Sequence, residues 1–189
     1  MAHDSYWDFL NSLEKAGELQ RISQPVATEL EITEIADREM KKPGGGKALL
    51  FEQPTINGHS SNIPLAINSY GSKKRTAMAL GVEDVEDTAT KLNKLVKARP
   101  PTSFGDAFKL LGTALDLRHA RPKRVSDGPC KEVIHKFEES QNNENIQQTP
   151  TLLDLPIQKC WPQDAGRFLT LPCVVTHDPD TGERNLGLY

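Results

Sequence analysis

The sequence of 189 residues has little of what marks several large classes of protein. Its three cysteines, Cys130, Cys160 and Cys173, are odd in number and far apart, so they support neither a disulfide framework nor a cysteine zinc site. A net charge of -3 is too small to indicate a nucleic-acid partner. Apolar runs stay well short of the roughly 20 residues that a membrane-spanning helix needs. Residues 1–5 lack the basic and apolar regions of a signal peptide, and we expect a cytoplasmic protein.

Apolar residues at helical spacing recur through the first hundred residues and predict several helices. The expected starts are residues that cap a helix or open an amphipathic run: Asp4 or Ser5, Thr28, Ser72, Val85 and Ser103. The expected ends are glycine or proline: Gly17, Pro43, Gly81 and Pro100. Thr28 and Glu31 have the spacing of a capping box, in which the hydroxyl and the carboxylate each satisfy a backbone N–H group at the start of the helix.

Short apolar runs between these helices predict strands over 18–22, 48–51 and 63–67. We expect a polar loop around Asn57-Gly58-His59 between the last two strands. A mixture of helices and short strands is typical of an α/β or α+β domain, which we place over residues 1–120.

Residues 121–150 are expected to connect this domain to a second one over residues 151–189. Cys130–His135 is predicted to form a strand. The stretch 138–150 is polar and nearly free of apolar residues, which is typical of a surface loop or linker.

Residues 168–189 carry the clearest strand pattern. Phe168–Leu171 and Cys173–Thr176 are rich in apolar and β-branched residues, and they predict an inner strand with an edge or bulge at Pro172. Residues 177–182 have the chemistry of a turn, and a returning strand is expected over 183–189. Because the pattern stops within a strand, we expect the sheet to continue in a longer parent protein.

Four separated blocks resemble the UbiD family of decarboxylases, in the order that the family has. They are DFLNSLEKAGELQRI, ELEITEIADR, NSYGSKKRTAMALG and LLDLPIQKCWPQDAGRFLTLPCVVTHDPDTGERNLGLY. The resemblance implies a mixed α/β N-terminal domain followed by the first strands of a flavin-reductase-like split β-barrel. It also implies a homo-oligomer that decarboxylates an aromatic or α,β-unsaturated carboxylic acid. Polyprenyl-hydroxybenzoate, in ubiquinone biosynthesis, is one family substrate.

The resemblance further places site residues on the last strand. The family's cofactor is prenylated FMN, which takes up the electrons left as CO2 departs, and a divalent metal bridges to its phosphate. The metal is Mn²⁺ or Mg²⁺, with K⁺ as a further candidate. Asn185 matches a metal ligand, and Leu188 and Tyr189 match residues that line the flavin. The family's catalytic Arg would be residue 190 and its acidic residues lie further on. We therefore expect a decarboxylase parent and no activity from this chain alone.

Three other motifs have simpler explanations than a ligand site. Pro43–Gly46 followed by Lys47 lacks the earlier glycine and the Ser or Thr of a phosphate-binding loop, so it is interpreted as the end of a helix. Lys73-Lys74-Arg75 at the start of a helix is typical of a solvated face. Asp178 and Asp180 lack the further oxygen ligands of a calcium loop and are interpreted as turn residues.

A second interpretation comes from a different class of function. Because the family's catalytic residues are not among these 189, the chain is alternatively a non-catalytic module that binds a partner or associates with itself. Such a module would bind through the N-terminal domain and an exposed strand edge.

Overall fold

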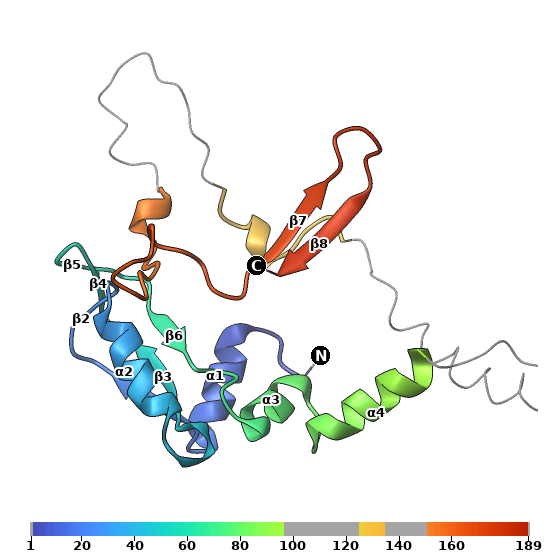
Figure 1. The fold of residues 1–189 in the computed structure, drawn as a ribbon, viewed down its shortest axis with the longest axis horizontal. Coiled ribbons are helices and arrows are strands. Elements are labelled where there is room, and N and C mark those ends of the chain that lie inside the picture. The colour runs from blue at the N-terminus through green and yellow to red at the C-terminus, as the bar shows by residue number, and fades with distance from the viewer. Residues whose placement is uncertain (1, 97–124, 135–150, 189) are drawn as a thin grey trace, which may run out of the picture. The chain divides into compact units, whose positions relative to one another are not determined.

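A computed structural model describes residues 2–96, 125–134 and 151–188 (Figure 1). The chain divides into two compact units, residues 1–85 with 150–189 and residues 86–149, which are described separately. The helix predicted after Ser103 and the domain boundaries predicted at 120 and 150 lie outside the described residues. Within the described ranges, every helix is too short or too polar to cross a bilayer.

A three-stranded mixed sheet forms the centre of the first unit. Strand β3 (Ala48–Phe51) is its middle strand, parallel to β1 (Leu19–Ile22) and antiparallel to β6 (Leu65–Ile67). All four residues of β3 are buried. A strand that is buried on both faces needs apolar residues throughout, which explains the uninterrupted sequence Ala-Leu-Leu-Phe.

Two helices pack on the side chains of β3, one helix for each set of alternating residues. Helix α1 (Tyr6–Lys15) brings Phe9, Leu10 and Leu13 into a cluster with Ala48 and Leu50. Helix α2 (Glu31–Met40) brings Ile32 and Ala36 into a second cluster with Leu49 and Phe51. Successive side chains of a strand point to opposite faces, so β3 supplies both clusters.

The polar loop predicted around residue 57 is instead the turn of a hairpin. A second small sheet pairs β2 (Val26–Ala27) in parallel with β4 (Pro54–Ile56), and β4 in antiparallel with β5 (His59–Ser60). Asn57 and Gly58, between β4 and β5, have φ angles of 51° and 83°. Positive φ at both central residues is the requirement of a tight hairpin turn, and Asn-Gly is the pair that meets it most easily.

Most of the predicted helix ends are confirmed. The Ser5 hydroxyl accepts a hydrogen bond from the Asp8 amide at the start of α1 (3.1 Å). The Ser72 hydroxyl accepts one from the Arg75 amide at the start of α3 (Lys73–Leu80; 3.2 Å), and Gly81 ends that helix with a left-handed conformation. Helix α4 (Val85–Val96) lies where its apolar spacing predicts it.

The capping box predicted at Thr28 is wrong. Helix α2 begins at Glu31, after Leu30, and no side chain caps it. The hydroxyl of Thr28 donates instead to the carbonyl of Thr55 on β4 (3.0 Å), and Glu31 accepts from the Ala27 amide (2.9 Å). Thr28 is fully buried beside the second sheet, so its hydroxyl bonds to the neighbouring strand rather than to the helix.

Two strand predictions in the second half are wrong for the described residues: Cys130–His135, of which 130–134 are described, and the first part of the inner strand, Phe168–Leu171. The region of Cys130 is a short 3₁₀ turn, Pro129–Lys131, because Pro129 follows Gly128 and the Lys131 amide returns to the carbonyl of Gly128 (2.8 Å). Phe168–Leu171 is irregular, because the Phe168 amide bonds to the carbonyl of Gln158 and Leu171 has a φ of 56°.

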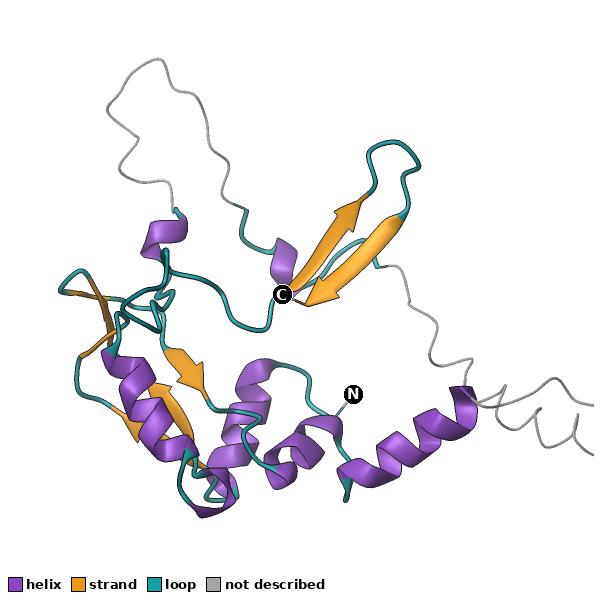
Figure 2. Cartoon of the chain, in the orientation of Figure 1, coloured by secondary structure: helices purple, strands orange, loops and turns teal. Residues whose placement is uncertain are grey.

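The C-terminal hairpin is confirmed, with strands β7 (Cys173–His177) and β8 (Arg184–Leu188) joined by a turn (Figure 2). Among the described residues β7 pairs only with β8, and most of its side chains are exposed. It is therefore not an inner strand within this part of the chain.

Because Leu13 is fully buried and Leu80 is 51% exposed, these two helical leucines form a matched pair for testing the core. We expect Leu13→Ala to lower the free energy of unfolding by about 3 kcal/mol, through lost burial and a residual cavity. Leu80→Ala should change it by less than about 1 kcal/mol. Urea denaturation followed by circular dichroism measures both, and equal losses in the two variants would contradict this assignment of the core.

Candidate functional site

The hairpin of β7 and β8 carries the residues predicted to bind metal and flavin. Its register pairs Asn185 with Thr176 and Leu188 with Cys173. Directly paired residues share a face of the sheet, and residues an odd number of positions apart lie on opposite faces. The side chains of Asn185 and Leu188 therefore project from opposite faces, and only one of them can enter a given pocket. Tyr189 lies outside the described residues.

Asn185 lies on a solvent-exposed face of the hairpin, and this face is polar at the end near the turn. Both Asn185 and its partner Thr176 are exposed, and Val174 and Gly187 continue the same face. An exposed amide carbonyl is a hard oxygen donor of the kind that Mg²⁺ and Mn²⁺ accept. In the ranges that the structure describes, no group of three His, Cys, Asp or Glu side chains could hold a metal ion. The role of Asn185 thus stays a prediction.

Asp178 is a turn residue, as predicted. One of its carboxylate oxygens accepts hydrogen bonds from the amides of Thr181 (2.7 Å) and Asp180 (2.9 Å). These backbone donors favour the charged form and hold the pKa of the Asp178 carboxyl below its usual value, with the Thr181 amide the larger cause. The carboxylate therefore serves to fix the turn that sets the register of β7 and β8.

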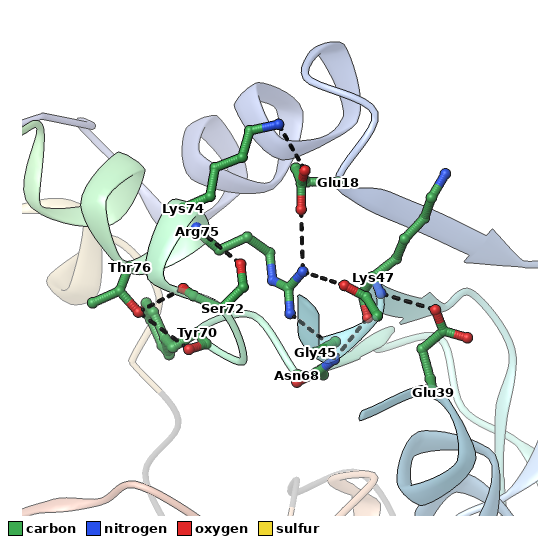
Figure 3. Close-up of polar contacts among 11 residues, drawn as sticks. Glu18, Glu39, Gly45, Lys47, Asn68, Tyr70, Ser72, Lys74, Arg75 and Thr76 are labelled. Carbon is green, nitrogen blue, oxygen red and sulfur yellow. Dashed lines mark hydrogen bonds and ion pairs between the residues drawn. The ribbon is translucent and has the colours of Figure 1, made fainter. Parts of the chain in front are cut away.

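The two remaining sequence motifs, the glycine run and the basic cluster of α3, meet at one buried guanidinium (Figure 3). Arg75 donates from Nη1 to the carbonyl of Gly46 (2.5 Å) and from Nη2 to the carbonyl of Gly45 (3.1 Å). The side-chain amide of Asn68 also donates to the Gly45 carbonyl (2.9 Å). This loop presents carbonyl oxygens to a cation, which is the opposite of the N–H cradle that binds a phosphate.

The prediction that Lys73–Arg75 forms a solvated face is wrong for Arg75, whose side chain is fully buried. Arg75 pairs with Glu18 (3.2 Å), which also pairs with the exposed Lys74 (2.7 Å). The hydrogen bond from Lys74, and to a smaller extent the one from Arg75, stabilises the charged carboxylate. The pKa of Glu18 therefore lies below its usual value, although partial burial acts in the opposite direction. The Nε atom of Arg75 is buried without a hydrogen-bond partner among the described residues. The cluster ties α3 to the start of β1 and to the glycine loop.

A separate group of polar contacts holds residues 156–168 against the N-terminal domain. We call these residues the linking segment. Lys159 and Glu29 form an isolated parallel β-bridge. The Lys159 amide donates to the Thr28 carbonyl (3.2 Å), and the Lys159 carbonyl accepts from the Leu30 amide (2.9 Å). Arg167 donates to the Thr28 hydroxyl at 2.6 Å. No sequence motif marked Arg167, because its side-chain partners Thr28 and Asn57 lie more than a hundred positions earlier.

A cavity of about 250 Å³ lies between the linking segment and β6. Its lining is uncharged and mostly apolar: Leu65, Ala66, Leu155, Pro156, Ile157, Gln158, Phe168, Leu169 and Thr170. A carboxylate buried there would have no cation to pair with, so these residues suit the apolar part of a ligand or a neighbouring side chain better than an acid group.

Comparison with known proteins identifies the family. The family model for the 3-octaprenyl-4-hydroxybenzoate carboxy-lyase N-terminal domain matches residues 10–96, and the model for the Rift-related domain of the same carboxy-lyase matches residues 124–189. This chain belongs to the UbiD family. The predicted family and the predicted mixed α/β class are both confirmed.

Relatives of the UbiD family are much longer than this chain. An uncharacterized protein of Aquifex aeolicus is 46% identical over 182 residues, which are 96% of this chain and 34% of that protein. The UbiD-class enzyme HmfF from Pelotomaculum thermopropionicum, solved in complex with FMN, is 25% identical with a TM-score of 0.62 over 95% of this chain and 32% of HmfF. An evolved dimeric form of HmfF, solved with prFMN, is 24% identical with a TM-score of 0.60 over 97% of this chain and 34% of its own. This chain spans about a third of the length of these relatives.

Arg75 and Lys74 offer a matched pair for testing the buried cluster. Arg75→Met should lower the free energy of unfolding by about 3 kcal/mol. It removes the side-chain donor of the Gly46 carbonyl, one of the two donors of the Gly45 carbonyl and one of the two cations that pair with Glu18. Lys74→Met removes only the exposed partner of Glu18 and should cost less than about 1 kcal/mol. Urea denaturation measures both losses. A stability of Arg75→Met equal to that of Lys74→Met would show that the buried cluster contributes nothing beyond a surface pair.

Proposed function

We propose that this chain supplies the N-terminal domain and the first barrel strands of a prenylated-FMN-dependent decarboxylase. The proposed reaction removes CO2 from an aromatic or α,β-unsaturated carboxylic acid. The observation that carries the proposal is that two domain models of one carboxy-lyase family match in order over residues 10–96 and 124–189. A polyprenyl-hydroxybenzoate, as in ubiquinone biosynthesis, is one substrate within this class.

In this proposal the cofactor supplies the electronic chemistry by taking up the electrons that remain when CO2 leaves. HmfF, solved with FMN and with prFMN, supports a flavin in the family. The chain's own contribution is the Asn185 carbonyl oxygen, offered to Mn²⁺ or Mg²⁺ from the exposed face of β8. Leu188 and Tyr189 would border the flavin; since the Leu188 side chain projects from the other face, Leu188 would contact a ligand beside Asn185 through its backbone.

The proposal also assigns the chemistry that this chain does not supply. Mg²⁺ requires near-octahedral coordination by several hard ligands, and Asn185 provides one oxygen. The resemblance places the remaining ligands, the catalytic Arg and the acidic residues after Tyr189. We therefore propose that residues 1–189 alone are inactive. We further propose that the parent protein is a homo-oligomer in the cytoplasm.

A second candidate function is favoured by the apolar face of the hairpin. Val175, Leu186 and Leu188 project from one face and are 55%, 62% and 66% exposed. Exposed apolar residues gathered on one sheet face are typical of a surface that another chain or domain covers. A non-catalytic module that associates through this face would show the same exposure, so activity must separate the two functions.

The decisive experiment is a decarboxylation screen of the full-length protein reconstituted with prenylated FMN and Mn²⁺. We expect release of CO2 from at least one member of a panel of aromatic and acrylic acids, and none from the isolated 189-residue chain. Product formation is measured by liquid chromatography. If the full-length protein retains prenylated FMN and yet turns over no acid, the interaction module becomes the better proposal.

Asn185 is tested in the full-length protein by the affinity for FMN at saturating Mn²⁺ and in EDTA. We expect Asn185→Ala to raise the Kd for FMN about tenfold with Mn²⁺ and to leave it unchanged in EDTA. The reason is that the amide oxygen contributes to FMN binding only through the metal ion. Asn185→Asp, which keeps an oxygen at the same position, should retain most of the affinity. Equal affinities of wild type and Asn185→Ala in Mn²⁺ would remove Asn185 from the site.

A further inference from the structure

The guanidinium of Arg167 joins separate parts of the fold. From Nη1 it donates to the hydroxyl of Thr28 (2.6 Å) and to the carbonyl of Ile157 (2.9 Å). From Nη2 it donates to the side-chain oxygen of Asn57 (3.3 Å) and pairs with Glu29 (3.6 Å). The side chain is 23% exposed, so solvent only partly screens these charge-assisted bonds. One residue of the linking segment is thereby held to two elements of the N-terminal domain.

Of the partners of Arg167, Thr28 lies in the well-packed interior of the domain, whereas Asn57 and Glu29 are exposed. Thr28 is fully buried, and its own hydroxyl proton goes to the carbonyl of Thr55, so its lone pairs face Arg167. Asn57 sits in the tight turn between β4 and β5. A site is positioned most accurately when its supporting residues are themselves held by packing and hydrogen bonds. The bond from Arg167 to Thr28 meets that condition.

The backbone beside Arg167 adds to the attachment. Leu30 has a φ of 66°, a region that a leucine rarely occupies, and its amide donates to the carbonyl of Lys159 in the linking segment (2.9 Å). Such a conformation costs about 1–3 kcal/mol and persists only where its surroundings favour it. Two hydrogen bonds accompany it here, one within the turn from the Glu31 amide to the Glu29 carbonyl (2.8 Å) and one from the Leu30 amide to the linking segment.

The attachment lies close in sequence to the candidate metal ligand. Five residues, 168–172, separate Arg167 from the start of β7 at Cys173. An extended chain advances at most about 3.6 Å per residue, so β7 must begin within about 20 Å of the Arg167 anchor. The register of β7 and β8 then places Asn185 opposite Thr176. Release of the anchor would remove this limit on where the hairpin, and with it Asn185, can lie.

We propose that Arg167 is a positioning residue, which holds the linking segment on the N-terminal domain so that the hairpin presents Asn185 to the metal and flavin. This inference rests on the proposed function. Arg167 itself is given no contact with metal, flavin or substrate.

The test is a double-mutant cycle in the full-length protein, with FMN and Mn²⁺ as probes and the Kd for FMN as the readout. Arg167→Ala should raise the Kd about tenfold in Mn²⁺ and not in EDTA. Added to Asn185→Ala it should cause no further loss, because both substitutions act on the same ligand. A merely structural defect would weaken FMN in EDTA as well. Arg167→Lys keeps the charge and the fold but reaches fewer acceptors, so its Kd should lie between those of wild type and Arg167→Ala.

Arg21→Ala is the matched control, because Arg21 also bridges two carboxylates, those of Glu14 and Glu52, and neither belongs to the linking segment. It should leave the Kd unchanged. Amide hydrogen exchange in the 189-residue chain gives an independent readout. Exchange at Leu30 and Lys159 should accelerate in Arg167→Ala and stay at the wild-type rate in Arg21→Ala.

Two outcomes would overturn the inference, and they are distinct. A loss of affinity in Asn185→Ala together with wild-type affinity in Arg167→Ala and Arg167→Lys would refute the role of Arg167 and leave the proposed function standing. Wild-type affinity in Asn185→Ala would refute the metal site of the proposed function, and the positioning role would fall with it.

Discussion

The burial of β3 on both faces is the constraint on which the N-terminal domain depends. Its four apolar residues contribute alternately to the cluster under α1 and to the cluster under α2, so neither helix has a core without it. A continuous strand also satisfies its own backbone groups through β1 and β6, which allows complete exclusion of water. The order of strands and helices around β3 follows from this arrangement.

The loops that enter and leave this core need polar partners, and long side chains provide them. The carbonyls of Gly45 and Gly46 face inward just before β3, where Arg75 and Asn68 donate to them. On the other side of the loop, Glu39 accepts the Lys47 amide (2.8 Å). A buried carbonyl without a donor costs free energy comparable to a lost hydrogen bond, so these side chains stabilise the path of the chain into β3. The most buried charge among the described residues of this domain therefore serves the fold.

Arg75 and Arg167 illustrate two uses of the same chemistry. Arg75 holds a loop within the domain, whereas Arg167 holds a segment from the far end of the sequence to it. A planar guanidinium with five donors can bond to several acceptors at once, which a lysine cannot reproduce. In the role proposed for Arg167, the position of Asn185 depends on this second arginine, since the hairpin begins a few residues after it. Under the proposed function, these contacts serve to place Asn185, the predicted metal ligand.

The sequence by itself determined the helices, the strand β3 and the C-terminal hairpin, because each is specified by local periodicity, capping and turn residues. It also carried the family and the prediction of Asn185, which depend on short contiguous motifs. Only the tertiary structure decided that Thr28 bonds to β4 instead of capping α2, that Phe168–Leu171 is irregular, and that Arg75 is buried. These outcomes turn on partners distant in sequence, and a side chain's hydrogen-bond partner or burial is set by what the fold brings next to it, which local pattern does not contain.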